Sequence, residues 1–338
     1  MKLPRIILRS LRFALSLLVL IIATAWTFGA LWYDFPVCAW RHPMAAGFVI
    51  AVLVALIMVH PRWKVMAGIA TAVVLVIAWW LTLKPSNDRD WLPDVALQPW
   101  AEVDGDVVTL HNVRNCDYRS NEDFTVHWET RTLHLSQITG IDAAMGYWGS
   151  EYMAHPILSF QFADSLPVAM SIETRKEKGE PHSSIRGLYR QYELIYIAAD
   201  ERDVFRVRTN YREGEGLYLY RTRVSPDAAR ERFLEYITTM NAMRKQPRWY
   251  NVLTTNCTTA IRTQHEVTRR MPFDWRMLLN GKIDSLFYEK DVLVTDGLPF
   301  AELKKRAFAN PAGRAADKSP DFSKLIRAGR PGFGVAPP

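Results

Sequence analysis

Residues 155–162, His155-Pro-Ile-Leu-Ser-Phe-Gln-Phe, alternate apolar and polar side chains, which is the period of a β-strand. The turn residues 163–165 follow, and Val168-Ala-Met-Ser-Ile172 has the composition of a second strand. The two runs therefore predict an antiparallel hairpin. Further short strands are predicted on either side, at residues 107–110, 124–128, 130–135, 140–145, 194–198, 204–207 and 216–220.

Helical signals begin after the last of these strands. Ser225 is a good N-cap and Pro226 suits the first helical position, so a helix is predicted to run to about Met243. A second helix is predicted from Cys257 to Val267. The sequence thus indicates an α+β domain, an antiparallel sheet with packed helices. The tail at 311–338 is rich in Ala, Gly, Pro and charge, and we expect it to be loosely ordered.

The first 84 residues have a different character. Apolar stretches at residues 13–33, 44–59 and 65–83 predict about three transmembrane helices, with aromatic residues near their ends. A signal peptide is the alternative for the first stretch, although no small-residue cleavage site follows it. A helical hairpin that enters the membrane without crossing is the alternative for the other two.

Basic residues indicate the orientation of these segments. Four lie within the first twelve residues, and Arg62 and Lys64 lie in the loop at 60–64, whereas Arg41 in the loop at 34–43 is balanced by Asp34. The positive-inside rule places the N-terminus and the 60–64 loop in the cytoplasm. Three crossings would then deliver residues 85–338 to the periplasm, which predicts a multi-pass protein of the bacterial inner membrane.

Composition narrows the function further. The chain has 338 residues and a net charge of +7, but its basic residues are interspersed with acidic ones, which argues against nucleic-acid binding. The three cysteines lack metal-binding spacing, so no metal and no cofactor are predicted. We expect a membrane region at 1–84, a linker and first strand at 85–109, a thiol domain at 110–310 and the tail. The sequence does not indicate an oligomeric state.

The segment Tyr250-Asn-Val-Leu-Thr-Thr-Asn-Cys-Thr-Thr259 carries the most chemical information. Its Thr and Asn residues favour a helix start, which places Cys257 in the first turn, where the helix dipole lowers a thiol pKa. Free N–H groups there could hold an oxyanion, with Asn256 and Thr258 as support. The alternative is a small buried cysteine that packs the helix start.

A thiol nucleophile needs a base, and the eight histidines can be sorted for one. His265 lies two helical turns beyond Cys257, too far along the helix to reach the sulfur. His155, at the start of the hairpin, is the predicted base, chosen over His111, His127, His134 and His182. Glu173, at the end of the neighbouring strand, is the predicted orienting carboxylate, and Asp164 is the second choice.

Several separate motifs, in order, resemble the DUF4105 family, also called the Lnb N-terminal periplasmic domain. They are the 155–162 and 250–259 segments, 171–180, Gly187-Leu-Tyr-Arg-Gln-Tyr-Glu193, 200–203 and 208–212, and the resemblance covers about residues 110–310. It implies a permuted papain-like thiol fold related to the NlpC/P60 group. The helices precede the domain here, whereas they follow it in the namesake enzymes.

The resemblance also implies an activity. The namesake branch transfers an acyl chain to bacterial lipoproteins, which by analogy makes Cys257 the acylated nucleophile and His155 the general base. Arg175, Arg190 and Tyr250 match motif positions and become expected substrate contacts, with structural ion pairs as the alternative for the arginines. Membrane lipid is the expected partner, with lipoprotein or peptidoglycan peptide as acceptor or substrate. Two other functions remain open: a cell-wall peptide amidase or peptidase, and a non-catalytic periplasmic module.

Overall fold

The computed structural model describes residues 5–265 and 270–334, and its contacts divide the chain into two compact units. The first, which we call the membrane unit, contains residues 1–86 with the short segments 181–192 and 249–251. The second, which we call the sheet unit, contains residues 87–180, 193–248 and 252–338. The end of the helix predicted to reach Val267 lies outside the described residues.

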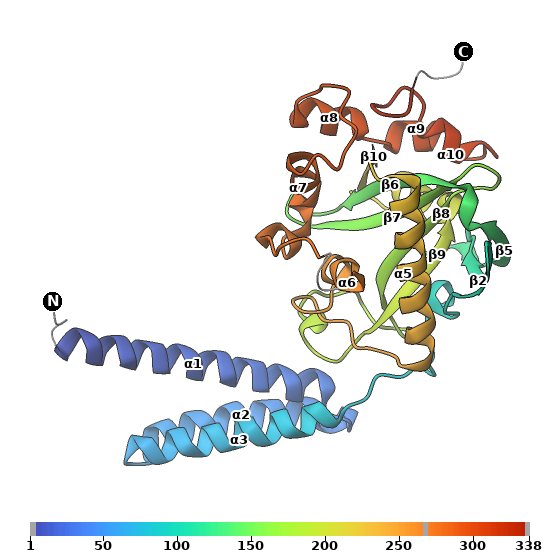
Figure 1. The fold of residues 1–338 in the computed structure, drawn as a ribbon. Helices are drawn as coiled ribbons and strands as arrows, with labels where there is room; N and C mark the ends of the chain where they lie inside the picture. The colour runs from blue at the N-terminus through green and yellow to red at the C-terminus, as the bar shows by residue number, and fades with distance from the viewer. Residues whose placement is uncertain (1–4, 266–269, 335–338) are drawn as a thin grey trace. The chain divides into compact units, whose positions relative to one another are not determined.

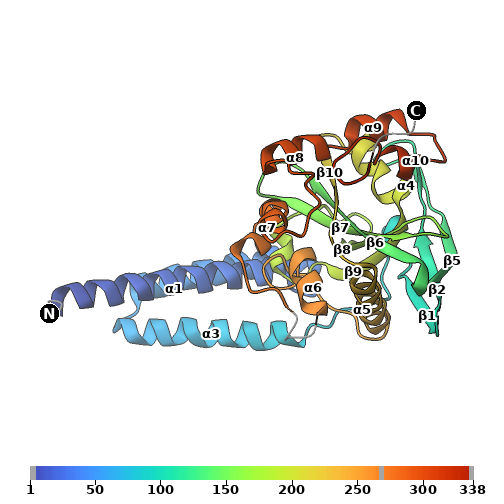
Figure 2. The ribbon, with the colours of Figure 1, turned by 45° about the horizontal axis from the view of Figure 1, so that its top comes forward.

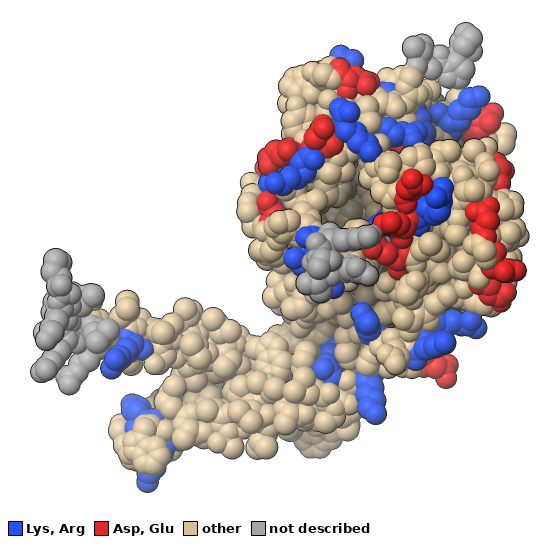
Figure 3. Space-filling view, viewed as in Figure 1, with Lys and Arg blue, Asp and Glu red and all other residues tan. Residues whose placement is uncertain are grey.

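Three long helices form most of the membrane unit, α1 (Arg5–Asp34), α2 (Cys38–Met58) and α3 (Arg62–Thr82). Each is long and apolar enough to cross a bilayer, which confirms the three membrane-length helices predicted from the sequence. The N-terminal end of α1 and the α2–α3 turn lie at the same end of the unit (Figure 1). Figure 3 shows helices that are nearly uncharged along their length, with Lys and Arg gathered at that end.

The carboxylate of Asp34, at the end of α1, organises the opposite end of the membrane unit. It accepts hydrogen bonds from Trp80 Nε1 at 2.6 Å, from the backbone N–H of Arg190 at 3.2 Å and from Gln191 Nε2 at 2.8 Å. The Arg190 guanidinium stacks on Trp80, 4.1 Å from the ring centroid. A buried carboxylate needs several such donors, and here they tie the 181–192 segment to the helix ends.

The sheet unit is built around one large sheet, eight-stranded within the described residues and ordered β1-β2-β9-β8-β7-β6-β10, with β5 paired to β2; β3 and β4 form a separate pair. The strands are β1 (Trp100–Asp104), β2 (Val107–Arg114), β3 (Asp117–Tyr118), β4 (Phe124–Thr125), β5 (Trp128–His134), β6 (Ile138–Tyr147), β7 (Ala154–Phe162), β8 (Val168–Arg175), β9 (Glu193–Asp200) and β10 (Gly216–Arg221).

The predicted hairpin is β7–β8, and its register pairs Ile157 with Ser171 and Phe160 with Val168. The prediction of a purely antiparallel sheet is wrong in one place: β2 runs parallel to β9, with Arg114 opposite Ala199, so the sheet is mixed. The β2 and β9 strands are far apart in the sequence, and a local alternation pattern carries no information on the direction in which such strands meet.

The helices of the sheet unit are α4 (Glu201–Val204), α5 (Pro226–Lys245), α6 (Cys257–Gln264), α7 (Ile283–Glu289), α8 (Phe300–Ala307), α9 (Asn310–Ala315) and α10 (Phe322–Leu325). Figure 2 shows α5 on one face of the sheet and α4, α9 and α10 on the other. Ser225 caps α5 as predicted, its hydroxyl accepting from Ala228 N. Phe233 and Tyr236 of α5 pack edge-on against Phe160 of β7.

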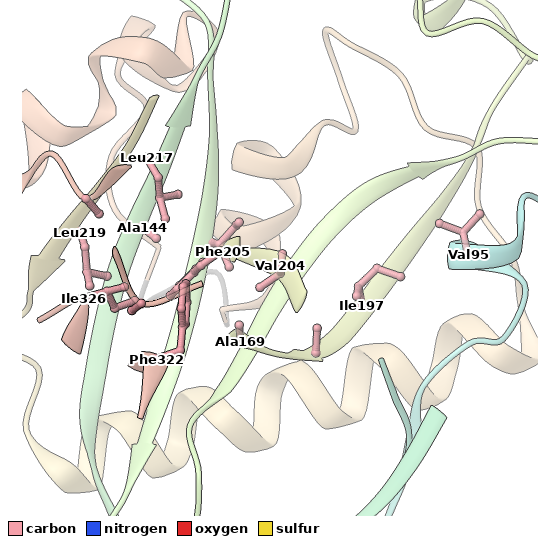
Figure 4. Close-up of a cluster of buried hydrophobic side chains, with 14 of the residues drawn as sticks. Val95, Ala144, Ala169, Ile197, Val204, Phe205, Leu217, Leu219, Phe322 and Ile326 are labelled. Atoms are coloured by element: carbon pink, nitrogen blue, oxygen red, sulfur yellow. The ribbon is translucent and has the colours of Figure 1, made fainter. Parts of the chain in front are cut away.

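The opposite face carries the apolar core drawn in Figure 4, which includes Val204, Phe205, Phe322 and Ile326. Residues 204–207 were expected to form a strand, but α4 ends at Val204 and a π-type turn occupies Val207–Tyr211. The apolar residues at 204–207 are compatible with either a strand or a helix. The difference comes from the preceding residue, because the Asp200 side chain accepts from Arg202 N and starts a helix.

The C-terminal segment differs from the loosely ordered tail that its composition indicates. Phe322 and Ile326 are fully buried, and Arg327 lies between two buried carboxylates. Its Nε donates to Asp142 at 2.8 Å, and its two terminal nitrogens donate to Glu201 at 2.7 and 2.6 Å. Three buried side chains are enough to fix a segment whose overall composition resembles a linker. The region before residue 110 is also packed, since Val95 joins the same core.

Candidate functional site

Cys257 is the first residue of α6, as the sequence predicts. Asn256 is the N-cap: its side chain accepts from Thr259 N at 2.9 Å, and the Thr259 hydroxyl accepts from Asn256 N at 2.9 Å, a complete capping box. The N–H groups of Cys257 and Thr258 open the helix and have no intrahelical acceptor. The thiol therefore sits, largely buried, at the positive end of a capped helix.

The imidazole reaches this thiol from the β7–β8 hairpin. His155 is near the start of β7 and Glu173 is near the end of β8; continuing the register from the Ile157–Ser171 pair sets them opposite each other. Ladder pairing stops at that Ile157–Ser171 pair. His155 hydrogen-bonds with Cys257, and its Nε2 lies 3.6 Å from Glu173 Oε1. The structure thus brings together the three residues chosen as nucleophile, base and orienting carboxylate.

Ser171 stands between the imidazole and the carboxylate. Its hydroxyl donates to Glu173 Oε1 at 2.8 Å and lies 2.6 Å from His155 Nε2. Because that hydroxyl proton is given to Glu173, its oxygen accepts from Nε2, which must carry a proton. The other ring nitrogen, Nδ1, is then left for Cys257. Ser171 was not singled out from the sequence, although its position two residues before Glu173 puts both on one face of β8.

Glu173 is held in place by arginine. Arg208 Nη2 donates to Glu173 Oε1 at 3.1 Å, and Arg208 Nε lies 3.1 Å from Glu215 Oε1. Burial raises the pKa of Glu173, but the hydrogen bond with His155 and the charge of Arg208 outweigh it and hold that pKa well below its usual range. The carboxylate is therefore ionised and favours a positive charge on the imidazole.

The thiol and the imidazole shift each other's pKa: that of His155 rises and that of Cys257 falls, so each shift favours the charged form of the residue. Burial lowers the pKa of His155, but hydrogen bonds with Cys257 and Glu173 outweigh burial and raise it to about 9. Burial raises the pKa of Cys257, but the hydrogen bond and charge of His155 outweigh it, so the thiol pKa falls below its ordinary value. Each shift favours the thiolate–imidazolium form of the pair, the reactive form of a cysteine nucleophile.

Asn280 completes the surroundings of the sulfur. Its Nδ2 lies 3.5 Å from Cys257 Sγ, and its Oδ1 accepts from Ala154 N at 3.0 Å. An amide N–H held beside the nucleophile can donate to an oxyanion that forms there. The sequence marks Asn280 only as the first residue of an Asn-Gly pair, which suggests a turn and no chemistry.

The two residues predicted to support an oxyanion have different surroundings. Both polar atoms of the Asn256 side chain bond to the backbone: its Oδ1 accepts from Thr259 N, and its Nδ2 donates to Val252 O at 2.8 Å. The Thr258 hydroxyl lies 3.9 Å from Cys257 Sγ. Thr258 therefore keeps contact with the thiol, whereas Asn256 fixes the helix that carries it.

The three predicted substrate contacts are divided between the two units. Arg175 is buried, donates to the carbonyls of Val95 and Ala96 at 2.9 and 2.7 Å, and stacks on Trp91. These contacts give Arg175 a structural role, anchoring the residues that precede β1. Arg190 and Tyr250 belong to the membrane unit, where Arg190 stacks on Trp80. Substrate contact by these residues stays a prediction.

Cys116 and His265 have partners other than the thiol of Cys257. Burial raises the pKa of the Cys116 thiol far above its ordinary value. His265 pairs with Glu235 at 3.0 Å. No group of three or more His, Cys, Asp or Glu side chains among the described residues is placed to hold a metal. Two surface hollows are lined by charged residues such as Arg131 and Arg206, which already pair internally with Asp200 and Asp317, so their chemistry is less specific than that of the thiol.

The lowered thiol pKa predicts a particular pH dependence of alkylation. Iodoacetamide should modify Cys257 with an inflection below the usual thiol value of about 8.5, because the thiolate persists until pH falls through the lowered pKa. Peptide mass spectrometry would follow Cys257, with Cys116 in the same samples as a thiol that stays protonated. In a His155→Ala variant the lowering by the imidazole is lost while burial remains, so the inflection should move to higher pH. An unchanged inflection would contradict the ion pair.

The fold and site define a membrane-anchored α+β domain with a cysteine, a histidine and a glutamate in hydrogen-bonded sequence. Comparison with known protein families agrees with the family that the sequence motifs indicate. The model of the Lnb N-terminal periplasmic domain matches residues 124–281, which confirms the family indicated by the motifs and spans His155, Glu173, Cys257 and Asn280. No curated protein and no solved structure matches the chain. The chain is thus a membrane protein that carries a domain of a periplasmic family.

Proposed function

We propose that this protein is a thiol acyltransferase of the bacterial inner membrane, with the sheet unit in the periplasm and Cys257 as nucleophile. The observation that carries the proposal is the hydrogen-bonded series Cys257, His155, Ser171, Glu173 at a helix N-terminus. A buried non-catalytic cysteine would not need a protonated imidazole beside it.

The orientation in the membrane is supported by charge and by geometry. The described start of α1 and the α2–α3 turn lie at one end of the membrane unit (Figure 1). In the sequence, basic residues cluster before and within the start of α1, and Arg62 and Lys64 follow the turn. Cytoplasmic loops carry the excess of Lys and Arg, which makes that end cytoplasmic. Three crossings then place the end of α3 on the other side. A reporter active only in the periplasm should work when fused after residue 338 and fail when fused before residue 1.

The site suggests the following chemistry. The Cys257 thiolate attacks the carbonyl carbon of a lipid ester, and the oxyanion accepts from the Cys257 backbone N–H and the Asn280 amide. The carbon–oxygen bond to glycerol breaks, and the His155 imidazolium protonates the leaving alkoxide, which leaves a thioester and a lysolipid. An acceptor amine then attacks the thioester, its proton passes to His155, and the thiolate is released as the amide forms.

The substrate assignment rests on the membrane helices and on the family. Only residues 83–86 separate α3 from the sheet unit in the sequence, so the thiol is tethered to a lipid surface at high effective concentration. The competing function is cleavage of cell-wall peptides by the same thiol, with water as the acceptor. The chemistry of the pair suits both, and the donor distinguishes them.

Trapping the intermediate tests the proposal. Full-length protein in detergent is incubated with phosphatidylethanolamine and phosphatidylglycerol, and intact mass and peptide mapping are measured with and without hydroxylamine. We expect a fatty-acyl adduct on Cys257 that hydroxylamine removes, and no adduct in a His155→Ala variant, with His265→Ala as the matched control that retains it. Cleavage of muropeptides without an acyl adduct would replace acyl transfer by amidase activity. If neither the acyl adduct nor the muropeptide cleavage is detected, both the acyltransferase and the amidase functions are overturned.

A further inference from the structure

Large apolar side chains gather at the surface beside the thiol. Two segments of the sheet unit, 152–153 and 273–279, contribute Tyr152, Met153, Phe273, Trp275, Leu278 and Leu279, which are between 37% and 63% exposed. We call these six residues the thiol-side surface. Single exposed apolar residues are ordinary, but a cluster that is rich in aromatic rings and adjoins a reactive group needs an explanation.

The two segments are connected through Gly281, which follows the second segment by two residues. Gly281 N donates to Tyr152 O at 3.0 Å, and a Cβ on Gly281 would lie 2.4–2.6 Å from the backbone of residues 151–153. Such close backbone contact is possible only for glycine. Within the second segment, Leu279 N donates to Trp275 O at 3.2 Å.

This surface adjoins the thiol directly. Asn280, which follows Leu279, places Nδ2 3.5 Å from Cys257 Sγ and accepts from Ala154 N. His155 follows Met153 by two residues. A molecule lying on the thiol-side surface would therefore have its nearest reactive partners in Cys257 and His155.

The charges around the surface compensate one another. Arg276 pairs with Asp274 and Glu289 at 2.9 and 2.8 Å, and Lys282 pairs with Glu151 at 2.5 Å. Figure 3 shows this mixture of signs around α7, beside a hollow that opens between α7 and α5. An acidic or basic protein partner would find no matching field here. Exposed Trp, Tyr, Phe and Leu with paired charges suit the interface of a bilayer.

We propose that the thiol-side surface inserts into the bilayer interface and takes the acyl chains of membrane phospholipid, so that the ester reaches Cys257 without the lipid leaving the membrane. Delivery of the ester to Cys257 rests on the proposed function, whereas contact between the thiol-side surface and lipid does not require acyl transfer to occur. The three membrane helices and the short 83–86 connection supply the tether that makes weak insertion of a few side chains sufficient.

Photo-crosslinking tests the inference. Full-length protein is placed in phosphatidylethanolamine/phosphatidylglycerol vesicles that contain a phospholipid with a diazirine in its acyl chain. After irradiation, peptide mass spectrometry maps the adducts, with those on α1–α3 as the positive control. We expect adducts on 152–153 and 273–279 and none on the exposed apolar residues Leu97 and Val103. Equal labelling at both places, or none on the thiol-side surface, would overturn the proposal.

Matched variants separate this inference from the proposed function. Phe273→Ser/Trp275→Ser should lose adducts on 152–153, whereas Leu97→Ser/Val103→Ser should not change them; Leu278→Ser/Leu279→Ser serves if the first pair fails to fold. Cys257→Ala should keep all adducts. Adducts without any Cys257 thioester would support lipid binding by the thiol-side surface and contradict acyl transfer. A Cys257 thioester without adducts would support acyl transfer and contradict lipid binding by this surface.

Discussion

Replacing Cys257 by alanine is expected to lower acyl transfer by about 10⁴-fold or more, the scale on which removal of a nucleophile acts, because no other group can form the covalent intermediate. His155→Ala should cost nearly as much. The thiol then loses both its proton acceptor and the charge that lowers its pKa, while the burial that raises the pKa remains. Effects of residues that act as one unit are not additive, so the double variant should be no slower than either single variant.

Lysolipid release from radiolabelled phospholipid measures this rate in the full-length protein. Cys38→Ala and His265→Ala remove a thiol and an imidazole outside the site and should leave the rate unchanged. Unfolding midpoints close to that of the unsubstituted protein would show that the fold is intact. Retention of a tenth of the activity by Cys257→Ala would remove this cysteine from the mechanism.

Arg327→Met should destabilise the sheet unit strongly. Arg327 donates to Asp142 and Glu201, both fully buried. Its removal takes the ion-pair partner from Glu201 and leaves Asp142 with Arg221 alone, at 3.1 Å. Loss of one partner of a buried ionic network costs about 3–5 kcal/mol. For a domain of this size that corresponds to a fall in the unfolding midpoint of roughly 6–20 °C.

The pH dependence gives this prediction a second readout. In the variant, burial without the charge of Arg327 would raise the pKa values of Asp142 and Glu201, so the native state would bind protons more tightly. The destabilisation should therefore be largest at neutral pH and shrink as pH falls towards 5. Tryptophan fluorescence in detergent would follow unfolding. Arg306→Met, which removes an exposed ion pair with Glu302, should change the midpoint little, and an equal effect of both variants would contradict the argument.

Local sequence patterns were sufficient for the elements that carry the candidate nucleophile and base. The alternation from His155 to Phe162 predicted β7, and the neighbouring run predicted β8; their register then sets Glu173 opposite His155 without further assumptions. The Thr and Asn residues before Cys257 predicted the start of α6, where the capping box is found. Each of these signals acts within a few residues, which is the range over which propensity and capping operate.

Contacts between distant segments could not be predicted in this way. Asn280 reaches Cys257 only because Gly281 permits close contact with the 151–153 backbone, and nothing local to Asn280 records that contact. The packing of residues 322–327 depends on Asp142 and Glu201, which are more than a hundred residues away in the sequence. Residues 201–204 form a helix, although the apolar run at 204–207 favours a strand, because the N-cap Asp200 outweighs this β-propensity.

The burial of Cys116 has a consequence for redox chemistry. In the proposed orientation the sheet unit works in an oxidising compartment, where an accessible thiolate is liable to disulfide exchange. Cys116 stays protonated and enclosed, so it makes a poor attacking thiol against a disulfide or a sulfenic acid formed on Cys257. Oxidation of Cys257 would then not be resolved by Cys116, and recovery of the Cys257 thiol would depend on an external reductant.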